Sequence, residues 1–220
     1  MVTRREVLKL GVVAGLSLLP EFLSQSGRPS LPTTLHVVSR EEWRAGEPDL
    51  QAAAEHGLYD PQTNPGGWLI YDAPLSEVLH TIVVHHTATY IKQHPREIQK
   101  WHRKRLGLAD IGYHFVINPE GIVCEGRDIG VRGAHTGGHN TGTVGVALFG
   151  QFELWRPAEV QIVQLKLLAA YLRDTYAITH LAGHRDFQPA ETVCPGRYLA
   201  DRLPDLAAEV GLAYGIGGEK

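Results

Sequence analysis

The sequence is poor in cysteine, with only two such residues, Cys124 and Cys194, in a chain of 220. Proteins that depend on disulfides for their stability carry several cysteine pairs, so this chain is not a disulfide scaffold. The two thiols could still form a single bridge in an oxidising compartment. Methionine is scarcer still, because Met1 is the only one. A blue-copper site with an axial methionine is therefore disfavoured.

The chain also lacks an excess of positive charge and any internal repeat. It has 21 basic and 24 acidic residues and a net charge of -3, and its basic residues form no stripe. We therefore expect no nucleic-acid partner. Hydrophobic residues make up 43% and charged residues 20%, which is typical of a globular protein. The length fits one domain with a single core.

The N-terminus combines a basic start with an apolar continuation. Arg4, Arg5 and Lys9 precede a short apolar run over residues 10–20, which is too short to span a bilayer. This pattern is typical of an export signal, and the paired arginines resemble the twin-arginine signal of bacteria. An amphipathic first helix is the alternative interpretation.

These features divide the chain into three parts. We predict an export signal and linker over residues 1–33, a folded domain over 34–212 and a C-terminal tail over 213–220. The protein would then leave a bacterial cell for the periplasm, the cell wall or the medium. It would meet the membrane only through its signal segment.

Hydrophobic periodicity predicts a mixture of strands and helices. Short apolar runs in "HTIVVHHTAT", "TVGVALFG" and "AITHLAG" indicate buried strands, and "IGYHFVINPEGIVCEGR" is typical of a hairpin. Helices are predicted in "HPREIQKWHRKRLG", in "RPAEVQIVQLKLLAAYLRDTY" and, interrupted by Pro204, in "PGRYLADRLPDLAAEV". Strands and helices do not alternate regularly, so we predict an α/β fold with a mixed central sheet flanked by helices.

Several local expectations follow from residue type. Ser39 and Glu42 are spaced as a capping box for a short helix. Pro195 is expected to begin the last helix, which would leave Cys194 at its N-cap. Residues 50–80 indicate only a turn-rich loop. The apolar helix faces are expected to consist of Ile98, Trp101, His102 and Leu106 in the first helix, and Val160, Val163, Leu167, Leu168, Tyr171 and Leu172 in the second.

Potential metal ligands follow two of the predicted strands. "TIVVHH" ends in His85 and His86, and His184 follows "THLAG". Together with Cys194 they provide three candidate ligands, since successive strand residues face opposite sides and only one of the adjacent histidines can reach a shared ion. Two imidazoles and a thiolate suit zinc and leave a fourth position for water. The spacing alone does not choose between His85 and His86.

Other interpretations of these residues remain open. Cys194 could be a nucleophile with His184 or His85 as its base. His184 could be a core or capping residue, and Cys194 a small buried apolar side chain. Tyr113 could donate a hydrogen bond to an oxyanion or simply pack in its strand. His135 and His139 lie in a glycine-rich loop and could line a groove or be solvated.

Five motifs in order, "SREEW", "TIVVHHTA", "IQKWHRKRLGLADIGYHFVINPEGIVCEGRD", "GAHTGGHNTGTVGVALFG" and "GHRDFQPAETVCPG", carry a resemblance. Over residues 36–202 the chain resembles the family of peptidoglycan recognition proteins and type 2 N-acetylmuramoyl-L-alanine amidases. This resemblance implies a zinc amidase fold and hydrolysis of the amide between N-acetylmuramic acid and L-alanine in peptidoglycan. The sequence departs from the family pattern in a longer loop before Cys194 and in an insertion at residues 50–78.

The resemblance also implies roles for particular residues. His85, His184 and Cys194 match zinc ligands, and Tyr113 matches a catalytic tyrosine. Thr192 matches a position near the reacting carbonyl. We further expect His114 and His135 to contact the substrate. Members of the family that only bind peptidoglycan typically lose the cysteine ligand, so its presence favours catalysis. The alternatives are a non-catalytic peptidoglycan-binding module and a Cys–His cell-wall peptidase.

Overall fold

The computed structural model describes residues 34–89, 94–187 and 191–218, and the predicted export signal lies outside these residues. The strands are β1 (Val37–Val38), β2 (Thr81–His86), β3 (Phe115–Ile117), β4 (Val123–Glu125), β5 (Thr143–Leu148), β6 (His180–Gly183) and β7 (Ala213–Tyr214). The helices are α2 (Leu75–Val78), α3 (Pro95–Arg105), α4 (Glu159–Tyr176), the 3-10 turn η1 (His184–Asp186), α5 (Arg197–Ala200) and α6 (Leu203–Glu209).

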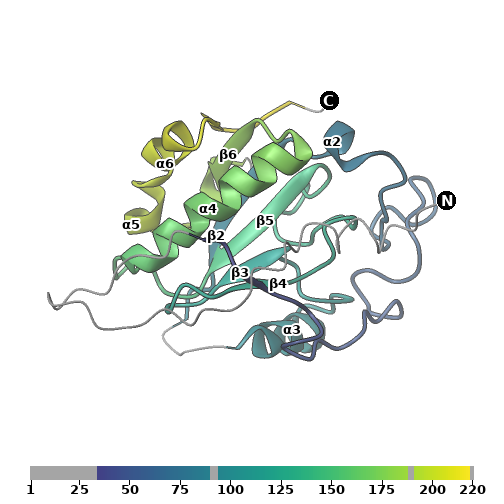
Figure 1. Ribbon diagram of the computed structural model, residues 1–220. Helices are drawn as coiled ribbons and strands as arrows, with labels where there is room; N and C mark the ends of the chain where they lie inside the picture. The colour runs from purple at the N-terminus through teal and green to yellow at the C-terminus, as the bar shows by residue number, and fades with distance from the viewer. Residues whose placement is uncertain (1–33, 90–93, 188–190, 219–220) are drawn as a thin grey trace, which may run out of the picture. The chain divides into compact units, whose positions relative to one another are not determined.

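The described strands form one mixed sheet in the order β1-β4-β3-β5-β2-β6-β7 (Figure 1). The β3–β4 hairpin is antiparallel, and the other neighbouring strands pair in parallel. The central strands β2 and β5 are buried along their whole length, as expected for a parallel sheet covered on both faces. The predicted α/β fold with a mixed sheet is confirmed. Residues 213 and 214, expected in the tail, form β7 against β6.

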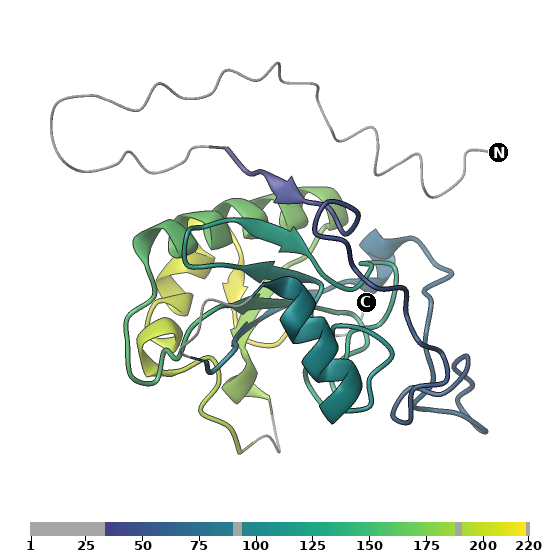
Figure 2. The same ribbon diagram turned by 90° about the horizontal axis from the view of Figure 1, so that it is seen from below.

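Helices cover both faces of the sheet (Figures 1 and 2). α4 and α6 pack on one face, against a core that includes Ile82 and Val84 of β2. α3 lies on the other face, where Ile98 packs with Val116 and Ala147. Because side chains alternate along a strand, every second residue of β2, β3 and β5 faces α3, and this face holds the site described below.

The predicted helices form, but their buried faces differ from those expected. In α3, Ile98 and His102 are buried, whereas Trp101 is 54% exposed and Leu106 47% exposed. Of the six residues expected to bury in α4, only Leu168 and Leu172 do so. The buried residues of α4 are Gln161, Ile162, Gln164, Leu165, Leu168, Ala169 and Leu172.

Hydrogen bonds explain part of the shift in α4. The amide of Gln161 donates to the carbonyl oxygens of Ile117 and Phe149 at 3.3 and 3.0 Å. A buried amide that is hydrogen-bonded costs little. The helix therefore turns Gln161 toward the sheet, although apolar periodicity alone assigns this residue to the solvent face.

Two expected helix starts are wrong in detail. Ser39 and Glu42 make both bonds of a capping box, at 2.7 and 3.2 Å, but they cap a turn at residues 40–44 and not a helix. Cys194 is not an N-cap, because α5 begins at Arg197 with Gly196 at the N-cap and Pro195 outside the helix. The break before Pro204 does divide the last helical segment, into α5 and α6.

The segment over residues 50–74 is irregular and is fastened by a buried ion pair. Glu55 accepts two hydrogen bonds from the guanidinium of Arg127, at 2.5 and 2.8 Å, and one from the backbone N–H of Ala109 at 2.8 Å. The side chain of Arg127 is 0% exposed, and its guanidinium lies 4.7 Å from the ring centroid of Trp68. The insertion is therefore tied through Ala109 to the loop that follows α3 and through Arg127 to the loop that follows β4.

The two thiols form no disulfide, since Cys124 in β4 and Cys194 are both free and buried. The bridge that the sequence left open is not made. Among the described residues, no helix has the length and apolar character needed to cross a membrane.

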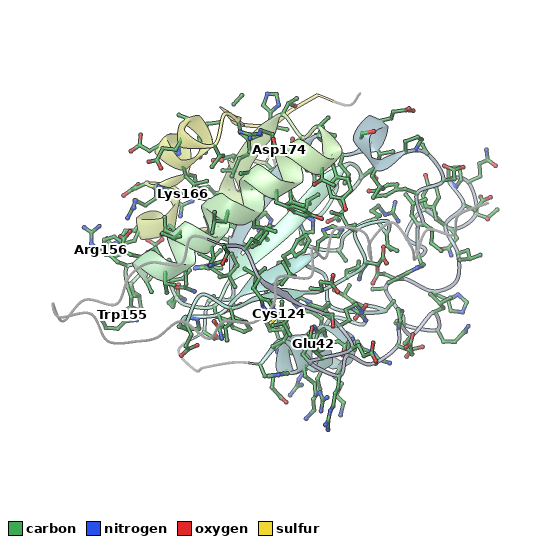
Figure 3. All side chains as sticks on the ribbon, viewed as in Figure 1. Glu42, Cys124, Trp155, Arg156, Lys166 and Asp174 are labelled. Carbon is green, nitrogen blue, oxygen red and sulfur yellow. The ribbon has the colours of Figure 1, made fainter. Side chains whose placement is uncertain are left out.

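The buried ion pair generates a stability prediction. Glu55→Gln should lower the free energy of unfolding by about 3–5 kcal/mol, because it leaves the charge of Arg127 buried without a partner. Urea denaturation of the variant and wild type measures this difference. The matched control is Glu209→Gln, which removes an exposed pair with Lys166 on the outer side of α4 (Figure 3) and should cost about 1 kcal/mol or less. Equal losses in the two variants would contradict the prediction.

Candidate metal centre

The parallel pairing of β2 with β6 brings two histidines to the same edge of the sheet. Val84 lies opposite Gly183 in this register, so the next residues along the two strands, His85 and His184, come side by side. Their ring centroids are 4.6 Å apart. The carboxyl ends of parallel strands are where open α/β sheets place their ligand sites.

The adjacent histidines of β2 point to opposite faces. The ring of His85 lies on the α3 face, with its centroid 5.1 Å from that of Tyr113. Nδ1 of His86 instead accepts a hydrogen bond of 3.2 Å from the backbone N–H of Phe152, a residue of the α4 core. The structure thus groups His85, and not His86, with the other two candidate ligands.

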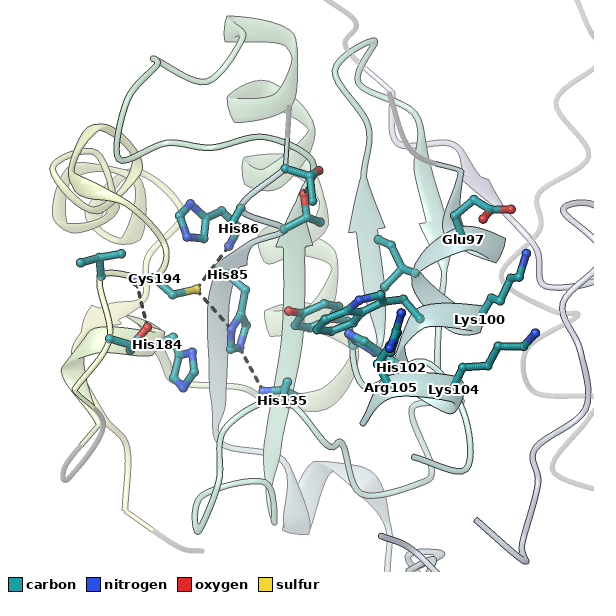
Figure 4. A pocket seen from close by; sticks show the side chains of 18 residues that line it. His85, His86, Glu97, Lys100, His102, Lys104, Arg105, His135, His184 and Cys194 are labelled. Carbon is teal, nitrogen blue, oxygen red and sulfur yellow. Dashed lines mark hydrogen bonds between the residues drawn. The ribbon is translucent and has the colours of Figure 1, made fainter. Parts of the chain in front are cut away.

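Cys194 completes the group (Figure 4). Its Sγ lies 3.6 Å from Nδ1 of His85 and accepts a hydrogen bond of 3.4 Å from the backbone N–H of His86. One nitrogen or sulfur atom from each of His85, His184 and Cys194 lies within 4.8 Å of the others. Three residues from distant parts of the chain are therefore close enough to share one ion.

The segment that carries Cys194 is held by hydrogen bonds to its neighbours. The backbone N–H of Arg185 donates to the Cys194 carbonyl at 2.9 Å, and the Arg185 guanidinium donates to the carbonyl of Val193. The N–H of Cys194 donates to Oγ1 of Thr192 at 3.1 Å. These bonds tie the cysteine to the residue that follows His184. Residues 188–190, in the loop between His184 and Cys194, lie outside the described residues.

The donor set and its protonation suit a zinc ion. Two imidazoles and one thiolate are ligands that zinc prefers, and three protein ligands leave a fourth position open. Burial lowers the pKa of both His85 and His184, which keeps the imidazoles in the neutral form that binds metals. Burial raises the pKa of Cys194 to about 12, and a cation at this place would favour its thiolate. The three residues fit zinc.

A cavity of about 820 Å³ opens over these residues and extends to α3. Tyr113 and Thr192 line it, together with the three candidate ligands. Burial raises the pKa of Tyr113 above its ordinary value, so the phenol keeps its proton and can donate a hydrogen bond. Thr192 accepts from Cys194 through Oγ1, which leaves its hydroxyl proton available to a ligand.

The two histidines expected to contact substrate are placed differently. His135 lines the cavity, and its Nδ1 lies 3.1 Å from Nε2 of His85. His114 is buried outside the lining, where its Nε2 pairs with the Val131 carbonyl at 3.0 Å and its Nδ1 accepts from the Gly145 N–H at 2.9 Å. Both ring nitrogens of His114 are therefore used by backbone groups, and the structure does not bring this residue to the cavity.

The far wall of the cavity contains residues that the sequence interpretation missed. Lys100, Lys104 and Arg105 of α3 line it, and Figure 4 shows the lysines extending from α3 on the side away from Cys194. The wall also includes Trp101 and one acidic residue, Glu97. The sequence signal for this wall was the presence of five lysine and arginine residues among the eleven residues of α3. Such a cluster is also typical of an ordinary solvent-exposed helix face, so it did not indicate a site.

A family model described as N-acetylmuramoyl-L-alanine amidase matches residues 75–197, a range that contains the candidate ligands and Tyr113. The chain belongs to the N-acetylmuramoyl-L-alanine amidase family. The N-acetylmuramoyl-L-alanine amidase of Homo sapiens is 36% identical to this chain over 140 residues, which cover 56% of this chain and 23% of that protein. The chain thus spans less than a quarter of this relative.

Two further members of the amidase family match more of their own length. Peptidoglycan-recognition protein SD of Drosophila simulans is 31% identical over 176 residues, covering 74% of this chain and 81% of that protein. The structure of the N-acetylmuramoyl-L-alanine amidase LysC from Clostridium intestinale superposes with a TM-score of 0.59 at 26% identity, covering 81% of this chain and 99% of that one. The family resemblance and the zinc amidase fold inferred from the motifs are confirmed.

His114 generates a prediction for pH dependence. Burial lowers its pKa to about 4, against about 6.5 in an unfolded chain. Between these values the unfolded state binds a proton that the folded state does not, so stability falls as the pH drops from about 6.5 to 4, by about 3 kcal/mol at this residue. His114→Gln keeps one donor and one acceptor but does not titrate, and should make the loss of unfolding free energy shallower by up to that amount.

Urea denaturation at intervals between pH 7 and pH 4, with a chelator present, measures this slope. The exposed His56→Gln serves as the control. The same slope in His114→Gln and wild type would contradict the assignment.

Proposed function

We propose that the protein is a zinc-dependent N-acetylmuramoyl-L-alanine amidase, which hydrolyses the amide between N-acetylmuramic acid and L-alanine in peptidoglycan. The observation that carries the proposal is the grouping of His85, His184 and Cys194 within 4.8 Å at the floor of an open cavity. Family membership supports it. The matched relatives include proteins named as amidases and a peptidoglycan-recognition protein, so the retained cysteine is what favours turnover over binding alone.

In this proposal His85, His184 and Cys194 hold the zinc ion. When bound, zinc supplies a Lewis acid that polarises an amide carbonyl and lowers the pKa of water. Tyr113 donates a hydrogen bond from its neutral phenol to the carbonyl oxygen as that oxygen gains negative charge. The hydroxyl proton of Thr192 is available for the same oxygen, since its lone pair receives the N–H of Cys194.

The positive charge of the cavity wall formed by α3 favours binding of an anionic substrate. A stem peptide carries at least its C-terminal carboxylate, and Lys100, Lys104 and Arg105 provide positive charge along the cavity. Among the described residues these three side chains form no ion pair, in contrast to Arg103, whose guanidinium lies 3.7 Å from the carboxylate of Asp49. We propose that this wall receives the peptide portion of the substrate while the sugar end lies toward the metal.

A Cys–His peptidase fits the site less well. A nucleophilic cysteine has a lowered pKa and a base that can take its proton. Here burial raises the pKa of Cys194 to about 12 and lowers that of His85 and His184. Both shifts oppose a thiolate–imidazolium pair. The lowered pKa of the histidines suits metal ligands, and a bound cation would favour the thiolate of Cys194.

We also propose that the protein acts outside the cytoplasm of a bacterial cell. Peptidoglycan lies there, and Arg4 and Arg5 precede an apolar run typical of a twin-arginine signal.

Replacement of the cysteine ligand tests the metal site. Cys194→Ser should lose most of the zinc found in wild type by elemental analysis. Its release of free N-terminal alanine from muropeptides should fall about 10³-fold or more, because a metal Lewis acid lowers the activation barrier by several kcal/mol and each 1.4 kcal/mol is tenfold in rate. Cys124→Ser is the matched control, since Cys124 lies in β4 outside the cavity lining, and it should retain zinc and activity.

Two results would overturn the proposed function. Turnover by metal-free protein would favour the peptidase, and binding of muropeptides by the zinc-loaded protein without any release of alanine would favour a non-catalytic binding module.

Charge reversal on α3 tests the substrate orientation. The double variant Lys100→Glu with Lys104→Glu should raise KM for muropeptides with free carboxylates about tenfold, since each exposed charge contributes up to about 1 kcal/mol. The effect should shrink at high salt and for substrates whose carboxylates are amidated. Lys166→Glu, on the opposite face, is the control. An unchanged KM in the double variant would show that the peptide portion does not bind along this wall.

A further inference from the structure

The ring of His135 is held against the candidate ligand His85. Its Nδ1 lies 3.1 Å from Nε2 of His85, and the two rings meet edge to face with centroids 5.0 Å apart. Oγ1 of Thr136 lies 2.9 Å from Nδ1 of His135 and 3.4 Å from Nε2 of His85. Two atoms that are able to accept a hydrogen bond therefore lie near the same nitrogen of His85.

The opposite nitrogen of His85 faces the other ligands. Nδ1 lies 3.6 Å from Sγ of Cys194, so it is the nitrogen available to a shared ion. A neutral imidazole that binds metal through Nδ1 carries its proton on Nε2, and the acceptor of that proton fixes the tautomer and the ring orientation. In many metal sites this acceptor is a carboxylate or a carbonyl. Here the atom in place is Nδ1 of His135.

The backbone around His135 is built to bring its ring this close. A Cβ at Gly145, in β5, would stand 2.4 Å from Cδ2 of the His135 ring, and one at Gly133 would stand 2.5 Å from the same atom. Only glycine at both positions leaves room for the ring. Oδ1 of Asn140 accepts the backbone N–H groups of His135 and Thr136, each at 2.8 Å, which fixes the loop that carries them.

We infer that His135 is a positioning residue that accepts the Nε2 proton of His85 and thereby holds Nδ1 toward the metal. The inference rests on the proposed zinc site. It replaces the expected substrate contact of His135 with an action through His85. It follows that Nε2 of His135 carries its own proton, and this nitrogen is one of three buried side-chain atoms without a hydrogen-bond partner among the described residues. The site thus leaves a buried donor unpaired in order to keep an acceptor for His85.

A pair of variants of similar shape tests the inference. His135→Asn places Oδ1 where Nδ1 of the imidazole was, whereas His135→Leu has no acceptor. Zinc affinity, measured by competition with a chromogenic chelator, should fall about 10–100-fold in His135→Leu, as for other lost partners of metal-bound histidines. It should stay close to wild type in His135→Asn. The absorption spectrum of the cobalt-substituted protein should change in His135→Leu and be retained in His135→Asn.

Controls separate this role from the alternatives. Thermal unfolding of the metal-free variants reports their folding, and His135→Phe, which fills the volume of the ring, takes the place of His135→Leu should that variant not fold. His56→Leu, an exposed histidine, should leave zinc affinity unchanged. The inference would be overturned if wild type, His135→Leu and His135→Asn had equal zinc affinity and His135→Leu had a raised KM. His135 would then be a substrate contact.

The same experiment distinguishes failure of the inference from failure of the proposed function. If wild type binds zinc and Cys194→Ser does not, the metal site stands whatever His135 does. If wild type itself binds no zinc, both proposals fail together.

Discussion

The register between β2 and β6 is the constraint on which the site depends. Pairing Val84 with Gly183 places His85 and His184 next to each other, and a slip of one residue would turn the His85 side chain to the opposite face of the sheet. The register is fixed because both strands are buried: Ile82, Val84 and Leu181 pack with α4 and α6 on one face, and Val83 and Ala182 pack with Phe187 on the other. Core packing thus sets the distance between two polar side chains at the sheet edge.

Burial gives these side chains their chemical character. Imidazoles removed from water hold their neutral form, and a phenol removed from water keeps its proton. The same low-dielectric surroundings strengthen every hydrogen bond that reaches the site, including the contact between His85 and His135. One feature, a cavity floor built into the protein interior, therefore serves ligand protonation, donor strength and orientation together.

Much of this arrangement could be predicted from the sequence, and the failures have physical causes. The β-branched run before His85 and the hairpin turn near Gly121 depend on local chemistry, so the strands and hairpin were predicted. The burial of Gln161 and the exposure of Trp101 depend on partners distant in sequence. The spacing of apolar residues contains no information about such partners. The choice of His85 over His86, the inward turn of His114 and the partnership of Glu55 with Arg127 are likewise decided by tertiary contacts.

The ligand set also has a consequence for the order in which the molecule matures. His85 and Cys194 lie 109 positions apart, so their meeting is a contact of long sequence separation, which forms slowly. A nascent chain still missing its last third would expose β2 and α3 without His184 and Cys194, which complete the candidate ligand set. If the proposed zinc site forms, metal binding during synthesis would therefore wait until nearly all of residues 81–194 has left the ribosome, and it would belong to the final stage of folding.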